Sequence, residues 1–235
     1  MIPHDTPLVL GALLFDDIDQ IDFTGPFEVL SRLSNSSLRT YAPAPGPVRD
    51  IRGLRLLPDA VLEEAPALDV LLVPGGYGQE ALMEDARVLD WIAARAAGAR
   101  VVFSVCTGAL LCGAAGLLRG RRATTHWNSF DLLPLFGATP VDERVVFDRD
   151  LLTAAGVTAG LDGALRLAAH LRGDAAAQAI QLYMAYAPEP PFNSGTPRTA
   201  PAAVLAEARA AAAPITARRL ATARRAAARL GVTVG

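Results

Sequence analysis

Lysine is absent from this sequence, and cysteine and histidine are scarce. All 22 basic residues are arginine, which excludes Schiff-base catalysis and the phosphate-binding lysine of nucleotide-binding loops. The two cysteines, Cys106 and Cys112, and the three histidines, His4, His126 and His170, do not have the spacing of a metal site. We expect no disulfide either, because the two cysteines would lie on different faces of one helix.

Long hydrophobic runs and a strong net charge are also missing. No apolar stretch reaches the roughly 18 residues that a membrane-spanning helix needs, and "MIPHDTP" lacks the basic region of a signal peptide. The net charge of −2 provides no field that would attract nucleic acid or a membrane. The sequence therefore predicts a cytoplasmic protein without nucleic-acid or membrane partners. Its 235 residues, 51% of them hydrophobic, suffice for a large core.

Apolar runs alternate with helical patterns along most of the chain. The segments 7–15 ("PLVLGALLF"), 68–76 ("LDVLLVPGG") and 100–105 ("RVVFSV") are typical of buried strands, because their apolar residues show no helical period. Strands that alternate with helices predict an α/β fold, with a mostly parallel sheet and helices on both faces. Active sites of such folds lie at the carboxyl ends of the strands. The loops after these three strands are therefore the ones to inspect.

Capping and breaking residues predict where several helices begin and end. We expect Thr24 to cap a helix with Pro26 in its first turn. Residues 81–99 should form one helix, and the helix after Cys106 should end near Gly120. A hairpin is expected at "DRD". The C-terminal region should be helical, with a break at Pro214.

Cys106 stands where a predicted strand meets a predicted helix. The stretch "VVFSVCTGALL" resembles a nucleophile elbow, in which a tight turn lifts a reactive side chain above the sheet, and Gly108 would permit that turn. The helix N-terminus should stabilise a thiolate and lower the pKa of the cysteine. A buried, unreactive cysteine is the alternative for this position. Cys112, inside the same helix, is interpreted as a packing residue.

The loop "VPGGYG" follows another central strand. Consecutive glycines such as Gly75 and Gly76 allow backbone N–H groups to converge on an anion. Beside a reactive cysteine, these groups would form an oxyanion hole. A turn without chemistry is the alternative. The spacing does not match the G-x-G-x-x-G pattern of dinucleotide-binding proteins.

Asp22 is the one acid of "DIDQIDFTGP" with apolar neighbours on both sides. Such surroundings raise the pKa of a carboxyl group, so Asp22 could exchange protons with a nearby cysteine. It could equally be an aspartate favoured by the start of a helix. Asp16, Asp17 and Asp19 are interpreted as solvated loop charges.

Several motifs together resemble the ThiJ/PfpI superfamily, which is related to class I glutamine amidotransferases. The sequence is most similar to its isocyanide hydratase branch, also called isonitrile hydratases. The motifs cover most of residues 7–200 in the expected order and are "DFTGPFEVL", "VPGGYGQEALMED", "SVCTGALLCGAAGLLRGRRATTHW", "LLTAAGVTAGLDGAL" and "YAPEPPFNSGTP". The resemblance implies a flavodoxin-like three-layer sandwich. It also implies a homodimer that converts isocyanides and water to N-substituted formamides without a cofactor or metal.

The same resemblance assigns roles to individual residues. Cys106 takes the position of the nucleophile, and Asp22 the position of the acid, where many other superfamily members have glutamate. Thr107 would offer its N–H group and hydroxyl to the site, and Gly76 a second N–H group. His126 occupies a position where some relatives have an active-site histidine, and we regard it as secondary.

Two other functions fit parts of the sequence. One is a different cysteine-dependent enzyme of the superfamily, either a glyoxalase-like hydratase or an amidase or peptidase. The other is a ligand-sensing module, because "GLLRGRRATTHW" also resembles the sensory domain of AraC-type regulators. We expect residues 1–200 to form the ThiJ/PfpI-like domain. Residues 201–235, with six arginines and one glutamate, would be a helical extension with a solvated basic face, packed on the same domain or a dimer partner.

Overall fold

A central sheet of seven strands organises the chain. The computed structural model describes residues 1–232, and the strand order in the sheet is β10-β11-β7-β6-β1-β2-β5. All neighbouring strands are parallel except the pair β10 and β11 at one edge. The strands are β1 Leu8–Leu13, β2 Ser36–Ala42, β5 Ala60–Val61, β6 Val70–Val73, β7 Val101–Val105, β10 Val145–Asp148 and β11 Leu151–Ala154. The predicted mostly parallel sheet is confirmed.

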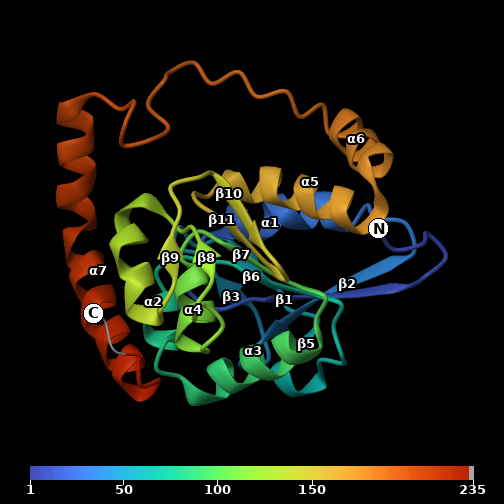
Figure 1. Ribbon diagram of the computed structural model, residues 1–235, viewed down its shortest axis with the longest axis horizontal. Helices are drawn as coiled ribbons and strands as arrows, with labels where there is room; N and C mark the ends of the chain where they lie inside the picture. The colour runs from blue at the N-terminus through green and yellow to red at the C-terminus, as the bar shows by residue number, and fades with distance from the viewer. Residues whose placement is uncertain (233–235) are drawn as a thin grey trace.

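Helices cover both faces of this sheet, as predicted. Figure 1 shows α1 and α5 on one face and α3 on the other. Both central strands β6 and β7 are buried along their whole length because helices enclose them on both sides. The helices are α1 Gln20–Leu30, α2 Gln79–Leu82, α3 Ala86–Gly98, α4 Gly108–Ala114, α5 Ala159–Arg172, α6 Asp174–Tyr183 and α7 Ala202–Arg229, with 3₁₀ helices η1 Leu62–Glu64 and η2 Trp127–Phe136. Two small sheets pair β3 Val48–Arg49 with β4 Arg55–Leu56, and β8 Arg122–Ala123 with β9 Thr139–Pro140.

The first helix begins earlier than the sequence predicted. Asp19, not Thr24, is its N-cap, and its side chain accepts a hydrogen bond from the N–H of Ile21. The hydroxyl of Thr24 instead donates to the side chain of Gln20, one turn back. The prediction was wrong because two good capping residues stand close together, and the first one starts the helix. Asp22 therefore lies in the first turn of α1.

Three other helix boundaries also differ from the prediction. Residues 81–99 contain two helices, because Asp85 accepts a hydrogen bond from the N–H of Val88 and caps a new helix, α3. Helix α4 ends at Ala114 rather than near Gly120. Helix α7 continues through Pro214 without a break. The hairpin at "DRD" is confirmed, since β10 and β11 pair antiparallel there.

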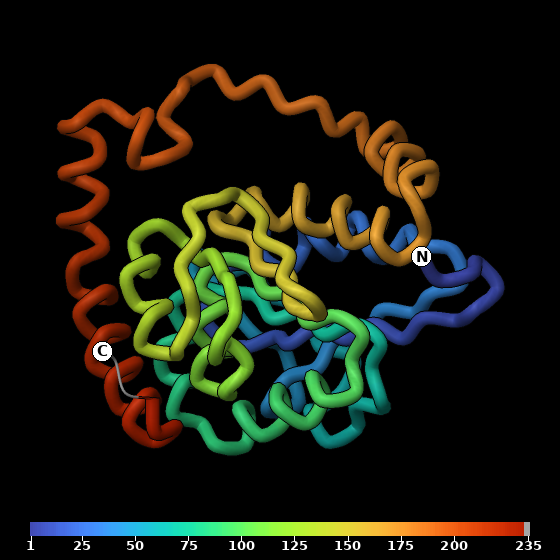
Figure 2. The backbone as a smooth tube through the Cα atoms, viewed as in Figure 1, coloured from blue at the N-terminus to red at the C-terminus, as the bar shows by residue number. Residues whose placement is uncertain are grey.

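The C-terminal helix reaches its position through a long segment without helix or strand. This segment, residues 184–201, runs from α6 to α7 over the outside of the molecule (Figures 1 and 2). Only the second half of α7 is buried, and it packs against η2, α2 and α4. Its buried residues recur every three or four positions: Ile215, Arg219, Thr222, Ala223, Ala226 and Ala227. The last three residues of the predicted extension 201–235 lie outside the described residues.

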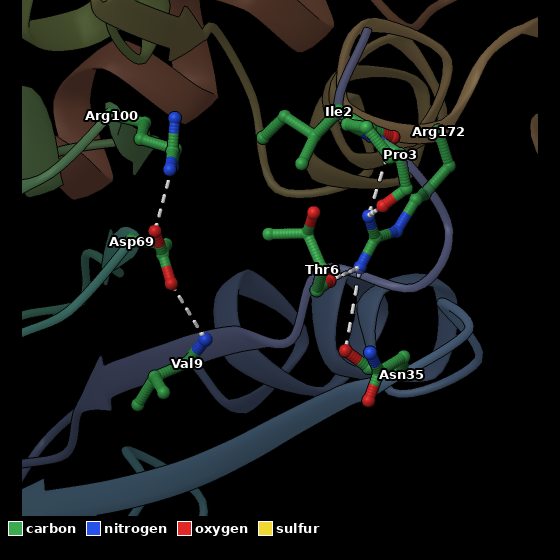
Figure 3. A network of polar contacts seen from close by, with 8 residues as sticks. All are labelled: Ile2, Pro3, Thr6, Val9, Asn35, Asp69, Arg100 and Arg172. Carbon is green, nitrogen blue, oxygen red and sulfur yellow. Dashed lines mark hydrogen bonds and ion pairs between the residues drawn. The ribbon is translucent and has the colours of Figure 1, made fainter.

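A buried arginine at the end of α5 fixes the N-terminal segment. Arg172 is 2% exposed, and its guanidinium donates to backbone carbonyls on both sides of β1 (Figure 3). The accepting carbonyls belong to Ile2, Pro3, Thr6, Ser34 and Asn35. These hydrogen bonds balance the cost of burying the charge, because each accepting oxygen replaces a lost water. They hold α5 and the α1–β2 turn together around the start of the sheet.

Among residues 1–232, no helix has the length and apolar character required to cross a membrane.

Candidate active site

Cys106 forms a sharp turn between β7 and α4. Its φ angle is 56°, in the left-handed region that non-glycine residues rarely adopt. Its N–H donates to the carbonyl of Ala154 at 2.9 Å, and its carbonyl accepts a hydrogen bond from the hydroxyl of Thr125 at 2.7 Å. These bonds hold the strained residue in place. Gly108 is required for the turn, because a Cβ atom there would lie 2.0 Å from the carbonyl oxygen of Val73. This is the geometry of the predicted elbow.

The two-glycine loop after β6 lies against this turn. The N–H of Gly75 donates to Oδ2 of Asp22 at 3.0 Å, and the N–H of Gly76 donates to Oγ1 of Thr107 at 3.2 Å. We expected these N–H groups to face an oxyanion, but each already has a partner within the protein. Their observed role is to connect α1, the β6 loop and the cysteine turn into one structure.

Asp22 is fully buried beside the cysteine. Burial raises the pKa of its carboxyl from 3.8 to about 8, and the negative charge of Asp19 acts in the same direction. The N–H of Gly75, the thiol of Cys106 and the charge of Arg219 favour the ionised form but do not outweigh burial. Within residues 1–232, the second carboxyl oxygen, Oδ1, has no amide or hydroxyl partner. The raised pKa predicted from the apolar neighbours of Asp22 is confirmed.

The predicted pKa of Cys106 was wrong in direction. Burial raises the pKa of the thiol well above its ordinary value, and the adjacent Asp22 raises it further. The N–H of Thr107 and the charge of Arg219 lower the pKa of the thiol, but they are weaker than burial. The sequence suggested only the helix N-terminus, whereas α4 has seven residues and the cysteine is enclosed. Burial thus disfavours the ionised form of both the thiol and the carboxyl group.

Thr107 and His126, the other residues that the sequence assigned to the site, make contacts other than those we expected. Oγ1 of Thr107 lies 3.3 Å from the carbonyl oxygen of Gly76, so this hydroxyl bridges the N–H and the carbonyl of one residue. His126 caps η2, and its Nδ1 lies 2.7 Å from Oδ1 of Asn128. Burial lowers the pKa of His126. In the described part of the chain, no hydrogen bond joins His126 to Cys106. Cys112 is completely buried and not disulfide-bonded, as expected for a packing residue.

A cavity of about 450 Å³ is lined by residues that neighbour the cysteine turn, although neither Cys106 nor Asp22 lines it. Thr125, which donates to the carbonyl of Cys106, and Ala155, which follows the acceptor Ala154, both line it. Its other walls come from residues 126–127, 130–131, 142–144 and 156–158, from residues 195–198 of the segment before α7, and from Arg209 of α7. The cavity contains both aromatic and charged side chains, and His126 lines it.

Sequence analysis missed one residue of this site. Arg219, on α7, is 2% exposed, and its Nη2 donates to the carbonyl of Gly76 at 2.8 Å. We interpreted the arginines of this helix as a solvated basic face, which is wrong for Arg219. Its position could have been noticed from spacing alone, because it lies four residues after Ile215 and four before Ala223 on the same helical face.

The fold and the site define a class of protein: a doubly wound α/β domain with a cysteine on a strained elbow and a buried acid opposite. The chain belongs to the DJ-1/PfpI family, whose model matches residues 10–170. It is 51% identical over 225 residues to the isonitrile hydratase of Pseudomonas putida, covering 96% of this chain and 99% of that protein.

Two further proteins are similar to this chain. The crystal structure of a ThiJ/PfpI family protein from Pseudomonas syringae superimposes with a TM-score of 0.92. It has 39% sequence identity and covers 94% of this chain and 93% of that one. The HTH-type transcriptional regulator GbdR of Pseudomonas aeruginosa is 29% identical over 188 residues, which are 77% of this chain but 51% of the regulator. The likeness to the regulator is therefore partial, whereas the likeness to the hydratase extends over both chains.

Proposed function

We propose that this protein is a cofactor-independent isocyanide hydratase that forms N-substituted formamides. The observation that carries the proposal is the buried pair of Cys106 and Asp22, in which the carboxyl has a pKa of about 8. Such a carboxyl can give and take a proton near neutral pH. The end-to-end similarity to an isonitrile hydratase selects the substrate class among cysteine-dependent reactions.

The first half of the reaction forms a covalent intermediate. The sulfur of Cys106 attacks the terminal carbon of the isocyanide, and a C–S bond forms. Asp22 gives its proton to that carbon, and the thiol proton passes to Asp22. The product is a thioimidate, Cys–S–CH=N–R, which contains every atom of the thiol and the isocyanide. Oδ1 of Asp22 suits this transfer, because no amide or hydroxyl group of the described residues occupies it.

The second half consumes one water. Asp22, which now carries the thiol proton, gives it to the imine nitrogen and takes a proton from water as the oxygen adds to the thioimidate carbon, so the carboxyl is again protonated. The adduct Cys–S–CH(OH)–NH–R collapses with cleavage of the C–S bond. The hydroxyl proton returns to the sulfur by way of Asp22, and the N-substituted formamide is released. In the net reaction, one isocyanide and one water give one N-substituted formamide, and the thiol of Cys106 is regenerated.

Thr107 and the two glycines would position the reacting groups. Gly75 orients the carboxyl of Asp22 through its N–H, and the hydroxyl of Thr107 fixes the peptide of Gly76. The N–H of Thr107 lies beside the Cys106 sulfur, where it would stabilise negative charge during attack and release. We assign no step to His126, which lines the neighbouring cavity.

The proposal extends to organisation and location. Residues 1–200 would form the catalytic domain, and residues 201–235 an extension that supplies Arg219 to it. We also propose a homodimer that works in the cytoplasm, on the resemblance to the ThiJ/PfpI superfamily.

Turnover by wild type and two cysteine variants tests this function. Hydration of an aryl isocyanide, followed by ultraviolet absorbance, should fall at least about a thousandfold in Cys106→Ala, because the nucleophile is removed. The matched variant Cys112→Ala removes a buried thiol of helix α4, which follows the elbow, and should keep its activity. If the wild type hydrates neither alkyl nor aryl isocyanides, the proposal is wrong. Turnover of 2-oxoaldehydes in its place would support the glyoxalase-like reaction.

A further inference from the structure

Helix α7 has one charged residue, Arg219, among its buried residues. The neighbours of Arg219 on the buried stripe of this helix are small or apolar, such as Ile215, Ala223 and Ala226. Burying a guanidinium group costs free energy unless it is hydrogen-bonded or near a negative charge. Packing against η2, α2 and α4 would be satisfied by an apolar side chain at this position. The presence of arginine therefore calls for a reason beyond packing.

The hydrogen bonds of Arg219 point to the active site. Nη2 donates to the carbonyl of Gly76, the residue whose N–H donates to Thr107. Nε is buried, and among the described residues it has no hydrogen-bond partner. The guanidinium lies 5.7 Å from the ring centre of Tyr77, which also belongs to the glycine loop. Arg219 thus contacts the loop that connects Asp22 to the cysteine turn.

The charged groups near the Cys106 sulfur act on the pKa of its thiol in opposite directions. Asp22 and Asp19, from α1 and its cap, both disfavour a thiolate. The N–H of Thr107 and the guanidinium of Arg219 favour it. The positive charge of Arg219 also lowers the pKa of His126, as does burial, which is the larger cause. The charge of Arg219 thus acts against the two carboxyl groups.

The groups facing the guanidinium itself come from α2, the glycine loop and its own helix. Tyr77 and Glu80 favour its charged form, and Arg218 opposes it. Glu80 accepts a hydrogen bond from the hydroxyl of Thr222, so its carboxylate is fixed nearby. Burial lowers the pKa of Arg219, yet an arginine stays charged at any working pH.

We propose that Arg219 is a positioning residue of the active site, which holds the Gly76 peptide against Thr107 and so keeps a fixed positive charge near the cysteine turn. The C-terminal helix then completes the site that the first 200 residues form. This statement about the thiol stands on its own, and only its consequence for isocyanide hydration rests on the proposed function.

The pH dependence of Cys106 alkylation separates charge from hydrogen bonding. Iodoacetamide reacts with the thiolate, and a C–S bond forms as iodide leaves; mass spectrometry of the Cys106 peptide excludes any contribution from Cys112. Arg219→Gln keeps a donor for the Gly76 carbonyl but loses the charge. Its alkylation profile should shift to higher pH by about one unit, so that the rate below the pKa falls about tenfold. Arg219→Lys keeps the charge, and its profile should stay close to that of the wild type.

A control and two contrary outcomes complete the test. Arg225→Gln removes an exposed arginine of the same helix, paired with Glu84, and should leave the profile unchanged. If Arg219→Gln reacts like wild type, or if Arg219→Lys shifts as far as Arg219→Gln, the proposal is overturned. Should Arg219→Gln not fold, Arg219→Met takes its place with the same expected shift, and a shifted profile in Arg219→Lys would still overturn the proposal. Alkylation needs no isocyanide, so failure of the hydratase function would leave this result readable.

Discussion

Replacing Asp22 with asparagine is expected to stabilise the folded protein at pH 8 while removing most of its isocyanide turnover. The native carboxyl has a pKa raised from 3.8 to about 8, so the folded state keeps a proton that the unfolded chain releases. Because the folded state binds more protons between these pH values, the free energy of unfolding falls as pH rises from about 4 to about 8. Asparagine has no such proton.

The expected size makes this effect measurable. Four pKa units correspond to roughly 5 kcal/mol, which is an upper bound for the gain of Asp22→Asn over wild type at pH 8. The gain should shrink as pH falls and vanish below about pH 3, where the carboxyl is protonated in both the folded and the unfolded state. Urea unfolding of the two proteins at pH 5 and pH 8 measures it. A stability difference that is independent of pH would contradict the raised pKa.

The loss of turnover in Asp22→Asn has a separate cause. The amide cannot donate and recover a proton as the carboxyl does, so turnover should fall by about 10²–10⁴-fold. Asp90→Asn, an exposed change on α3, should leave turnover and the pH dependence of stability unchanged. If Asp22→Asn keeps full turnover, the carboxyl does not manage the protons of the reaction.

Gly75→Ala is expected to disable the site through a single methyl group. A Cβ atom at this position would lie 2.6 Å from both the N and the Oγ1 of Thr107 and 2.9 Å from Oδ2 of Asp22. Such contacts force these groups apart, which should cost about 1–3 kcal/mol of stability. Displacing them by even a fraction of an ångström should reduce turnover at least about a hundredfold.

The matched control is a glycine with open space around its Cβ position. Gly98→Ala, in the last turn of α3, meets no heavy atom within 4 Å and should leave turnover unchanged. Steady-state rates and thermal melting of both variants measure the two effects. Wild-type turnover in Gly75→Ala would mean that the contact between the glycine loop and the cysteine turn has no catalytic role.

The central strands could be predicted from the sequence because strands that are buried on both faces consist almost entirely of apolar residues. The strand residues 70–73 and 101–105 have no solvent-facing side, so all of them except Ser104 are apolar and they show no regular alternation of polar and apolar residues. The meeting of Asp22, Gly75 and Cys106 was also predictable, since parallel strands deliver their following loops to one edge.

Other features could not be predicted from the sequence, because they depend on competition between helix caps or on contacts between distant parts of the chain. Asp19 and Thr24 are both good caps, and only the packed chain decides between them. The direction of the Cys106 pKa shift depends on how deeply the elbow is enclosed, which local spacing does not encode. Arg219 lies 143 residues from its partner Gly76, so the local sequence around either residue does not predict their hydrogen bond.

The most direct test of the account is to look for the covalent intermediate on Cys106. Wild-type protein and an aryl isocyanide labelled at the terminal carbon would be mixed for a single turnover, quenched in acid, and digested for peptide mass spectrometry. The account predicts a mass increase equal to that of the isocyanide on the Cys106 peptide, which appears and decays as formamide forms. Label on another residue, or formamide formation with no protein-bound label at any quench time, would contradict it.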